Sequence, residues 1–338
     1  MSFTVQVKPS GHQFTTRGGE SILDAAERQG IQLPYGCRNG LCGSCSGTLL
    51  SGSLNYPEEV EEDELSAHDE GYCLPCKAVA TSDVVIHIKE VETEKQIEVR
   101  TLPCKVDEMQ QLSHDVMRVY LRLPDNQRLQ FLAGQYIDFL MPDGRRRAFS
   151  MANAPHDDER IELHIRYVEG GEFTEHVFDT MKPGDIHSIQ APLGGFYLRE
   201  NSERPLIFMA GGTGFAPLKG ILEHARHIGT KRPIHFYWGV RSQRDLYLDE
   251  LAAGWAAEND NIRFTAVLSE PDADWEGAKG WVHEQVLADH PDMSGVDLYM
   301  SGPPPMIFAA RDAFKDAGLS EDHMYSDVFE WAKDNPKK

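Results

Sequence analysis

The sequence lacks any run of apolar residues that approaches the roughly 20 needed to cross a bilayer, so we expect no membrane insertion. It also lacks an excess of positive charge, since 33 basic residues stand against 54 acidic ones and the formal net charge is −21. Nucleic acids and anionic membranes repel such a surface, which argues against both as partners. The first seven residues have neither the basic start nor the apolar core of a signal peptide, and we therefore expect a cytoplasmic protein.

Cysteine is scarce as well, because six in 338 residues are too few for a disulfide scaffold. Five of the six nevertheless fall between Cys37 and Cys76. In a cytosolic chain this clustering favours metal binding over disulfides. The 41% hydrophobic and 26% charged residues are typical of a folded chain, and the length suits two or three domains.

Three stretches with different periodicities follow one another along the chain. Residues 1–93 mix short strand-like runs with one helix that we predict over 21–28. Residues 98–200 hold alternating runs separated by turn residues, which is typical of an antiparallel barrel. From 203 to 333 apolar strands alternate with helices, a pattern that predicts a parallel sheet. The charged stretch 90–96 is interpreted as a linker.

The clustered cysteines have the spacing of an iron–sulfur site. Cys37, Cys42 and Cys45 follow the pattern C-x4-C-x2-C of plant-type [2Fe-2S] proteins, which requires a distant fourth cysteine. Cys73 and Cys76 are both available for that place. The segment around them resembles the ferredoxin segment in which the ligand follows a Leu and a small or turn residue, and this favours Cys76. Zinc also suits four cysteines, although zinc sites more often pair two short C-x2-C knuckles.

Two short motifs in the middle stretch suit a bound pyrophosphate. The first is Arg147-Ala148-Phe149-Ser150, whose guanidinium matches phosphate geometry. The second is Gly171-Glu172-Phe173-Thr174, which comes shortly after His164 and Ile165. It resembles the G-x-x-[ST] turn of a flavoprotein family, in which backbone N–H groups and the hydroxyl cradle a pyrophosphate at a helix start. A Gly-Gly turn by itself more often belongs to a hairpin. The second motif is interpreted as a phosphate site because of its spacing after the first motif.

The last stretch carries two more motifs, each after an apolar strand. Gly211-Gly212-Thr213-Gly214 lies between a strand at 206–210 and a helix that we predict over 218–228, and Pro217 suits the first helical turn. The glycines allow a tight turn and the close approach of a pyrophosphate. Ser301-Gly302-Pro303 follows a second apolar strand.

In this order, the motifs resemble those of the ferredoxin–NADP reductase superfamily, and in particular its reductases with an N-terminal plant-type ferredoxin domain. The resemblance covers nearly the whole chain and implies a multidomain protein. We expect a β-grasp ferredoxin domain of the α+β class over 1–93 and an antiparallel six-stranded FAD-binding β-barrel over 98–200. An α/β Rossmann-like NAD-binding domain with a parallel sheet is expected over 203–333.

The resemblance also implies roles for single residues. In the family an Arg contacts the flavin pyrophosphate, an aromatic residue packs along the ribityl chain and ring, and a Ser bonds near the flavin N5. These roles fall on Arg147, Phe149, which replaces the family Tyr, and Ser150. Ser301 replaces the Cys that lies beside the nicotinamide, so Ser150 and Ser301 are the catalytic candidates. The other expected FAD and NADH contacts are Ala148, His164, Ile165, Gly171, Glu172, Phe173, Thr174, Gly211, Gly212, Thr213, Gly214, Pro217, Glu270, Gly302 and Pro303, and the expected cluster ligands are Cys37, Cys42, Cys45 and Cys76.

For function, the resemblance implies an NADH-dependent oxidoreductase that passes electrons through FAD and the [2Fe-2S] cluster to a partner enzyme. The family includes reductase components of bacterial mono- and dioxygenases and, as the nearest counterpart, the CDP-6-deoxy-delta-3,4-glucoseen reductases of deoxysugar synthesis. We therefore expect a monomer that supplies a dehydratase or an oxygenase component. A stand-alone NADH reductase of small acceptors such as free flavin, or a redox sensor without enzymatic activity, is the alternative.

Three further features have less specific interpretations. The acidic run 57–64 is interpreted as a solvated face, with a docking patch for an acceptor protein as the alternative. Cys104 has no partner nearby in the sequence and is expected to be a buried structural thiol. Phe329 is expected, by analogy with the family, to cover the flavin.

The choice between NADH and NADPH is predicted from Glu270. NADP-using members of the family carry Ser-Arg at this place to bind the 2′-phosphate, whereas this chain has Ser269-Glu270. A carboxylate repels a phosphate and can accept a hydrogen bond from a ribose hydroxyl, so NADH should have the higher kcat/KM. Glu270→Arg should shift the ratio of the two kcat/KM values toward NADPH by roughly tenfold, equivalent to about 1.4 kcal/mol. Steady-state kinetics with both nucleotides checks this, and a higher kcat/KM for NADPH in the unmodified protein contradicts it.

Overall fold

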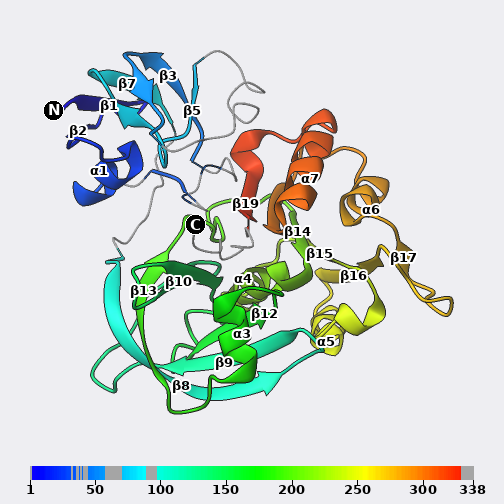
Figure 1. The fold of residues 1–338 in the computed structure, drawn as a ribbon. Helices are drawn as coiled ribbons and strands as arrows, with labels where there is room; N and C mark the ends of the chain where they lie inside the picture. Colours follow the sequence, from blue (N-terminus) through cyan, green and yellow to red (C-terminus); the bar gives the residue numbers. More distant parts are fainter. Residues whose placement is uncertain are drawn as a thin grey trace. The chain divides into compact units, whose positions relative to one another are not determined.

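The computed structural model describes residues 2–31, 33–35, 38, 40, 45–57, 71–88 and 97–328. The chain divides into two compact units, Met1–Gln96 and Ile97–Lys338, and each is described by itself (Figure 1).

The first unit is built on a five-stranded sheet with the strand order β2-β1-β7-β3-β5. β1 pairs in parallel with β7, and the other pairings in this sheet are antiparallel, which is the β-grasp arrangement. β4 and β6 form a second, two-stranded antiparallel sheet. The elements are β1 (Thr4–Lys8), β2 (Gln13–Thr15), α1 (Ile22–Arg28), β3 (Gly47–Ser51), β4 (Leu54–Asn55), β5 (Tyr72–Cys73), β6 (Val79–Ala80) and β7 (Val84–His87).

Helix α1 forms where the sequence predicts it, because capping and burial act together. The hydroxyl of Ser21 accepts a hydrogen bond from the backbone N–H of Asp24 and so caps the first turn. Its buried side chains pack into the same core as the buried residues of the sheet. Cys45, Cys73 and Cys76 belong to this core, so the cysteine segment is anchored by apolar packing.

The second unit opens with a six-stranded antiparallel sheet in the order β11-β10-β13-β8-β9-β12. An isolated antiparallel bridge between Met151 and Leu163 joins the two outer strands and closes the sheet into a barrel. Helix α3 lies beside β12 (Figure 1). The elements are β8 (Arg100–Gln111), β9 (Val116–Arg122), β10 (Tyr136–Leu140), β11 (Arg146–Ser150), β12 (Ile161–Arg166), α3 (Glu172–Asp179) and β13 (Ile186–Leu193).

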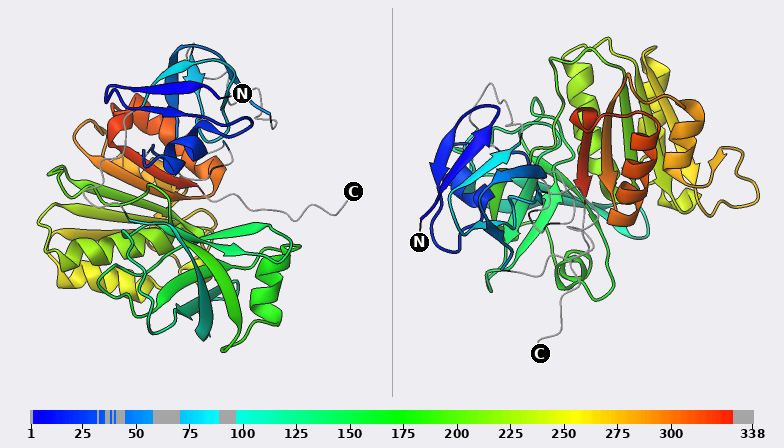
Figure 2. Two further views of the ribbon diagram at one scale, coloured as in Figure 1. Left: turned by 90° about the vertical axis from the view of Figure 1, so that its left-hand side faces the viewer. Right: turned by 90° about the horizontal axis from the view of Figure 1, so that it is seen from above.

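The rest of this unit is a parallel sheet in the order β17-β16-β15-β14-β18-β19. Helices α4 and α5 cover one of its faces and α6 and α7 the other (Figure 2). The elements are β14 (Leu206–Gly211), η1 (Gly212–Gly214), α4 (Phe215–His227), β15 (Ile234–Val240), η2 (Gln243–Asp245), α5 (Asp249–Glu258), β16 (Ile262–Leu268), β17 (Ala278–Lys279), α6 (Val282–Asp289), β18 (Asp297–Gly302), α7 (Pro304–Asp316), η3 (Glu321–His323) and β19 (Met324–Val328).

This arrangement confirms the predicted fold class. Helix α4 begins at Phe215, three residues before the predicted start, because Pro217 is tolerated in a first turn where its missing N–H has no partner to lose. Cys104 is buried in the barrel core, and burial raises the pKa of its thiol to about 12. None of the helices in the described ranges is both long enough and apolar enough to cross a membrane.

A buried ionic network joins the barrel to the nucleotide-binding half of the second unit. Lys219, on α4, donates from Nζ to Oε2 of Glu162 on β12 at 3.0 Å and to the carbonyl oxygen of Ala152 at 3.1 Å. Oε1 of Glu162 lies 2.9 Å from Nε2 of His164, and Nδ1 of His164 lies 3.1 Å from the hydroxyl of Tyr247. Both halves therefore supply charges that have lost their contact with water.

The network is stable because each charge has a partner. Burial disfavours the ionised form of Glu162, but its bonds with His164 and Lys219 outweigh burial and lower its pKa to about 2. Burial lowers the pKa of His164, which keeps the imidazole neutral. Burial also opposes the charge on Lys219, yet the carboxylates of Glu162 and Glu223 raise its pKa overall.

Glu162→Gln should therefore lower the free energy of unfolding at pH 7 by about 3 kcal/mol. The folded-state pKa of Glu162 is depressed, so its contribution is complete above about pH 4.5 and is lost as the pH falls toward 2. The difference between variant and unmodified protein should shrink over that window. Urea unfolding followed by tryptophan fluorescence at pH 7 and pH 3 measures it, with the exposed Glu250→Gln as the control. The same difference at both pH values would contradict the assignment.

Candidate functional site

Two of the four predicted cluster ligands lie together in the first unit. Sγ of Cys45 is 3.2 Å from Sγ of Cys76, and both side chains are buried. A disulfide requires an S–S distance of about 2.05 Å, so the two sulfurs are neighbours that are not bonded to each other. Cys37 and Cys42 lie outside the described residues.

Cys73, the rival for the fourth ligand position, has a different environment. It is fully buried on β5, and burial raises the pKa of its thiol to about 12. Because metal ligation requires the thiolate, this environment favours a protonated core residue. The arrangement of the described cysteines fits a cluster held through Cys45 and Cys76.

The first flavin motif lies on β11, where successive side chains alternate between the two faces. Phe149 contacts Phe139 and Phe173, with ring-centroid distances of 6.0 and 5.4 Å. Arg147 lies two residues before Phe149 and therefore on the same face. Ala148 is exposed and Ser150 is buried on the opposite face.

The second flavin motif forms a tight turn before α3. The hydroxyl of Thr174 accepts a hydrogen bond from the backbone N–H of Val168 at 3.1 Å. A Cβ on Gly171 would lie 2.7 Å from that hydroxyl, so the turn is closed to larger residues. Glu172 forms an ion pair with Arg145 at 2.6 Å. Backbone N–H groups at the start of α3 are suited to a phosphate, as the sequence predicts.

The side chains of His164 and Ile165 are both buried inside the protein. His164 belongs to the buried network with Glu162 and Tyr247, and Ile165 is fully buried in the barrel core. Any contact of these two residues with FAD must therefore come from the main chain.

A third residue, Asp327, lies next to both catalytic candidates, by a side-chain bond to Ser150 and by strand pairing with Ser301. Ser150 donates a hydrogen bond from Oγ to Oδ2 of Asp327 at 3.1 Å, and both side chains are about 5% exposed. Asp327 on β19 is the register partner of Ser301 on β18, so their side chains emerge on the same face of the parallel sheet. The structure thus bonds Ser150 to a carboxylate whose residue is the strand neighbour of Ser301.

The hydroxyl of Ser301, the second catalytic candidate, fits a residue that contacts a bound ligand. Its side chain is fully buried, and no described residue supplies a hydrogen-bond partner for its Oγ. Buried hydroxyls without partners are rare in folded proteins, except where a bound molecule completes the site. This fits a nicotinamide placed beside Ser301.

The glycine turn at the end of β14 packs directly against the end of β18. A Cβ on Gly214 would lie 2.0 Å from the carbonyl oxygen of Ser301, and one on Gly211 would lie 2.5 Å from Sδ of Met306. Gly302 likewise approaches Gly211, since its Cβ would come within 3.1 Å of the Gly211 Cα. Side chains at these positions would force the two strand ends apart.

The turn also has the backbone geometry of a phosphate site. Gly212 has φ +53°, and its carbonyl oxygen accepts a hydrogen bond from Nε1 of Trp238 at 2.9 Å. Thr213 continues the turn into α4, and Pro217 is buried in the first turn of that helix. Pro303 stands just before α7 at the neighbouring strand end. Parallel sheets bind nucleotides at this carboxyl edge, so the motif residues are placed for NADH.

Glu270 follows β16 at the same carboxyl edge of the sheet. Its backbone N–H donates to the carbonyl oxygen of Arg241 at 2.8 Å, and its side chain is exposed. The carboxylate is therefore accessible to a ribose, in keeping with the predicted role.

Arg166 is a site residue that the sequence did not reveal. It ends β12 in the barrel, yet its Nη1 lies 3.2 Å from the position of a Cβ on Gly212 in the nucleotide turn. Asp115 holds the guanidinium, with Oδ2 at 2.7 Å from Nε of Arg166. A positive charge from the barrel therefore stands over the predicted pyrophosphate turn.

Asp327 was missed for a similar reason, because its partners are distant in sequence. The segment 325–329 draws attention to its aromatic residue Phe329, which lies outside the described residues. No spacing rule links Asp327 with Ser150, which stands 177 positions earlier. A carboxylate one residue before an apolar Val at a strand end is a common pattern, so it does not single out Asp327.

Three protein-family models match the chain in the expected order. The 2Fe-2S iron–sulfur cluster binding domain matches residues 5–81, the oxidoreductase FAD-binding domain matches 103–197, and the oxidoreductase NAD-binding domain matches 208–312. Together with the geometry above, these matches define an electron-transfer reductase that uses NAD(H), FAD and a [2Fe-2S] cluster.

Individual relatives are similar over nearly the full length. The CDP-6-deoxy-L-threo-D-glycero-4-hexulose-3-dehydrase reductase of Yersinia pestis is 40% identical over 332 residues, covering 97% of this chain and 99% of the relative. A terephthalate 1,2-dioxygenase reductase component of Comamonas sp. is 33% identical over 334 residues, covering 97% and 98%. The crystal structure of the Amycolatopsis cytochrome P450 reductase GcoB matches with a TM-score of 0.79 and 32% identity, covering 97% and 98%. The chain belongs to the ferredoxin–NADP reductase superfamily, among the reductases that carry an N-terminal ferredoxin domain.

Asp327→Asn and Ser150→Ala should each lower kcat of NADH oxidation by roughly ten- to a hundredfold, because a hydrogen bond to a charged group contributes about 1.5–3 kcal/mol. The KM for NADH should change little, since neither residue lies in the glycine turn. Asp327→Asn removes the charge of the acceptor and Ser150→Ala removes the donor. Because both changes act on one bond, the double variant should be no slower than the slower single variant. Stopped-flow reduction of FAD by NADH measures the rates at equal FAD content. Additive losses would show that the two residues act separately.

Proposed function

We propose that this chain supplies electrons from NADH, one at a time, to a dehydratase that acts on a CDP-linked deoxyhexulose. The observation that carries the electron-transfer part is the hydrogen bond between Ser150 of the barrel and Asp327, the strand neighbour of Ser301, at the junction of barrel and parallel sheet. The dehydratase is proposed because the 40% identical relative is by name the reductase of such an enzyme.

The proposed mechanism assigns each motif one task. NADH is held by the turn Gly211–Gly214 and Glu270, with its nicotinamide beside Ser301. An FAD held by Arg147 and the turn at Gly171–Thr174 would supply the conversion of a hydride's electron pair into single electrons, and a [2Fe-2S] cluster held by the cysteines would supply a one-electron acceptor. Asp327 accepts the hydrogen bond of Ser150 and so fixes the orientation of its hydroxyl, which would lie near the flavin N5. Arg147, the turn at Gly171–Thr174 and the barrel surface around Phe149 hold the FAD.

A second acceptor class has support of its own. Reductase components of terephthalate and toluate dioxygenases and of phenol 2-monooxygenase are 32–34% identical over at least 92% of this chain. An oxygenase component is therefore the alternative acceptor. The contact surface decides between the two classes, and the acidic run 57–64, proposed as a solvated face with docking as the alternative, lies beyond the described residues except for Pro57.

The electron path is tested by an anaerobic NADH titration of the holoprotein, followed by visible absorbance and EPR. Flavin bleaching followed by the rhombic signal of a reduced [2Fe-2S] cluster supports the path. Cys76→Ser should abolish that signal and the delivery of electrons to the dehydratase, while NADH oxidation with ferricyanide continues because FAD remains. Cys73→Ala is the matched control and should keep both, since Cys73 is a buried thiol with a pKa raised to about 12.

The outcomes separate the parts of the proposal. If the cluster survives Cys76→Ser and is lost in Cys73→Ala, the fourth ligand is Cys73 and not Cys76. Full electron delivery by the cluster-deficient variant would favour a stand-alone reductase of small acceptors. NADH consumption coupled to an oxygenase component and not to the dehydratase would replace the proposed acceptor.

A further inference from the structure

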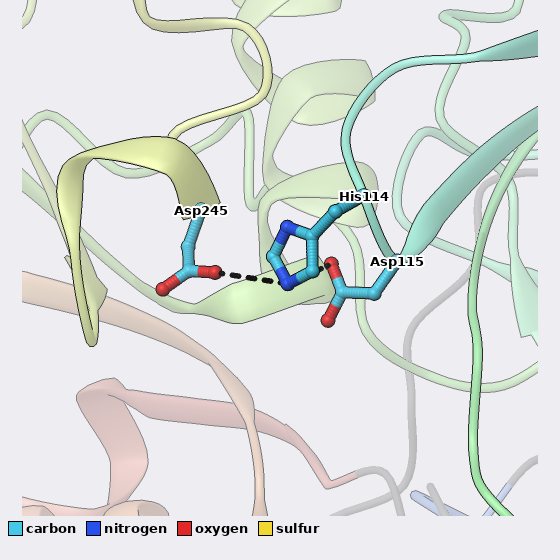
Figure 3. A group of neighbouring side chains, drawn as sticks. All are labelled: His114, Asp115 and Asp245. Atoms are coloured by element: carbon cyan, nitrogen blue, oxygen red, sulfur yellow. Dashed lines mark ion pairs between the residues drawn. The ribbon is translucent and has the colours of Figure 1, made fainter.

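One imidazole and two carboxylates converge at a place in the second unit that the proposed electron path does not use (Figure 3). His114 and Asp115 lie on the loop between β8 and β9 of the barrel, and Asp245 ends η2 in the nucleotide-binding half. Nε2 of His114 is 3.8 Å from Oδ1 of Asp115 and 3.7 Å from Oδ1 of Asp245. Within the described ranges, these three residues form the one group of His, Cys, Asp and Glu with the spacing of metal ligands.

Asp245 supplies an independent sign of a missing ligand. Its side chain is only 9% exposed, and its Oδ2 accepts hydrogen bonds from the backbone N–H and the hydroxyl of Ser242 at 2.8 and 2.9 Å. Its Oδ1 is buried and has no hydrogen-bond partner in the part of the chain that the structure describes. A buried carboxylate oxygen without a donor is costly, and this oxygen faces His114.

Hydrogen bonds within the group do not explain the arrangement. The two distances from Nε2 exceed the roughly 3.2 Å limit of an N–H···O bond, and one N–H cannot serve two carboxylates at this length. Oδ1 of Asp115 accepts from the hydroxyl of Ser113 at 3.1 Å, and Oδ2 is taken by Arg166. Oδ1 of each carboxylate is thus the oxygen nearest the imidazole without a bond to it.

The spacing is close to that of a zinc site. Ligands about 2.0–2.1 Å from a tetrahedral zinc lie about 3.3–3.4 Å from one another, whereas these three atoms lie within 4.8 Å of one another, so the side chains would need to move together by up to about 1 Å. His114 is exposed, which leaves an entry path and room for water at the remaining position. The imidazole selects against Mg²⁺ and Ca²⁺, which prefer oxygen ligands alone.

We propose that His114, Asp115 and Asp245 bind one divalent transition-metal ion of the zinc class and so fasten the β8–β9 loop of the barrel to the nucleotide-binding half. The site uses none of the cysteines. It adjoins the electron path through Asp115, which also holds Arg166 over the glycine turn.

The test is equilibrium dialysis of the FAD- and iron-loaded protein against zinc chloride, with bound zinc, iron and FAD counted per chain. The unmodified protein should bind one zinc ion more than His114→Ala and Asp245→Asn, with equal iron and FAD in all three. His114→Ala changes an exposed residue, and Asp245→Asn keeps the side-chain shape that caps η2. His176→Ala changes another histidine of the second unit and is the matched control. It should bind as much zinc as the unmodified protein does.

A second measurement keeps the test decisive if a variant is less stable. Zinc chloride should raise the thermal midpoint of the unmodified protein and of His176→Ala, and leave that of His114→Ala and Asp245→Asn unchanged. Equal zinc content in all four proteins would overturn the site, because the extra ion would then bind elsewhere. No bound zinc in the unmodified protein would also overturn it, and would leave His114 as a charge partner of the two carboxylates.

Discussion

The ion pair between Lys219 and Glu162 determines how the two halves of the second unit meet. Lys219 lies five positions after Gly214, and its ammonium reaches both Glu162 and the carbonyl oxygen of Ala152. Ala152 lies two positions after Ser150, so one buried bond links the nucleotide turn to the flavin motif. The two desolvated charges stay in contact because separating them would leave each one unpaired in the interior.

The predicted nicotinamide and flavin positions depend on that registration. Asp327 reaches Ser150 from the outer strand of the parallel sheet, and Arg166 reaches the glycine turn from the barrel. Each residue belongs to one half and acts at the other. Hydride transfer requires that the donor and acceptor atoms be positioned to within a few tenths of an ångström. Rigid elements on both sides of the junction supply that precision.

Much of the fold follows from local patterns. The alternation in 98–200 predicts antiparallel strands and the strand–helix rhythm after 203 predicts a parallel sheet, and both are confirmed. The cofactors follow from short motifs because each motif contains its whole mechanism. The C-x4-C-x2-C spacing bends one loop around a cluster, and the turn Gly211–Gly214 admits a pyrophosphate through backbone N–H groups alone.

The sequence by itself determined the order of the domains, the three cofactors and the residues that stand on single motifs, since these depend on neighbours within about ten positions. Only the tertiary structure revealed the roles of Asp327 and Arg166, the network around Lys219 and the convergence of His114 with Asp245. Each joins residues that are more than 40 positions apart and has no local periodicity. Pairing of this kind is decided when the barrel closes and the parallel sheet packs against it, because burial then fixes which charges and hydroxyls face each other.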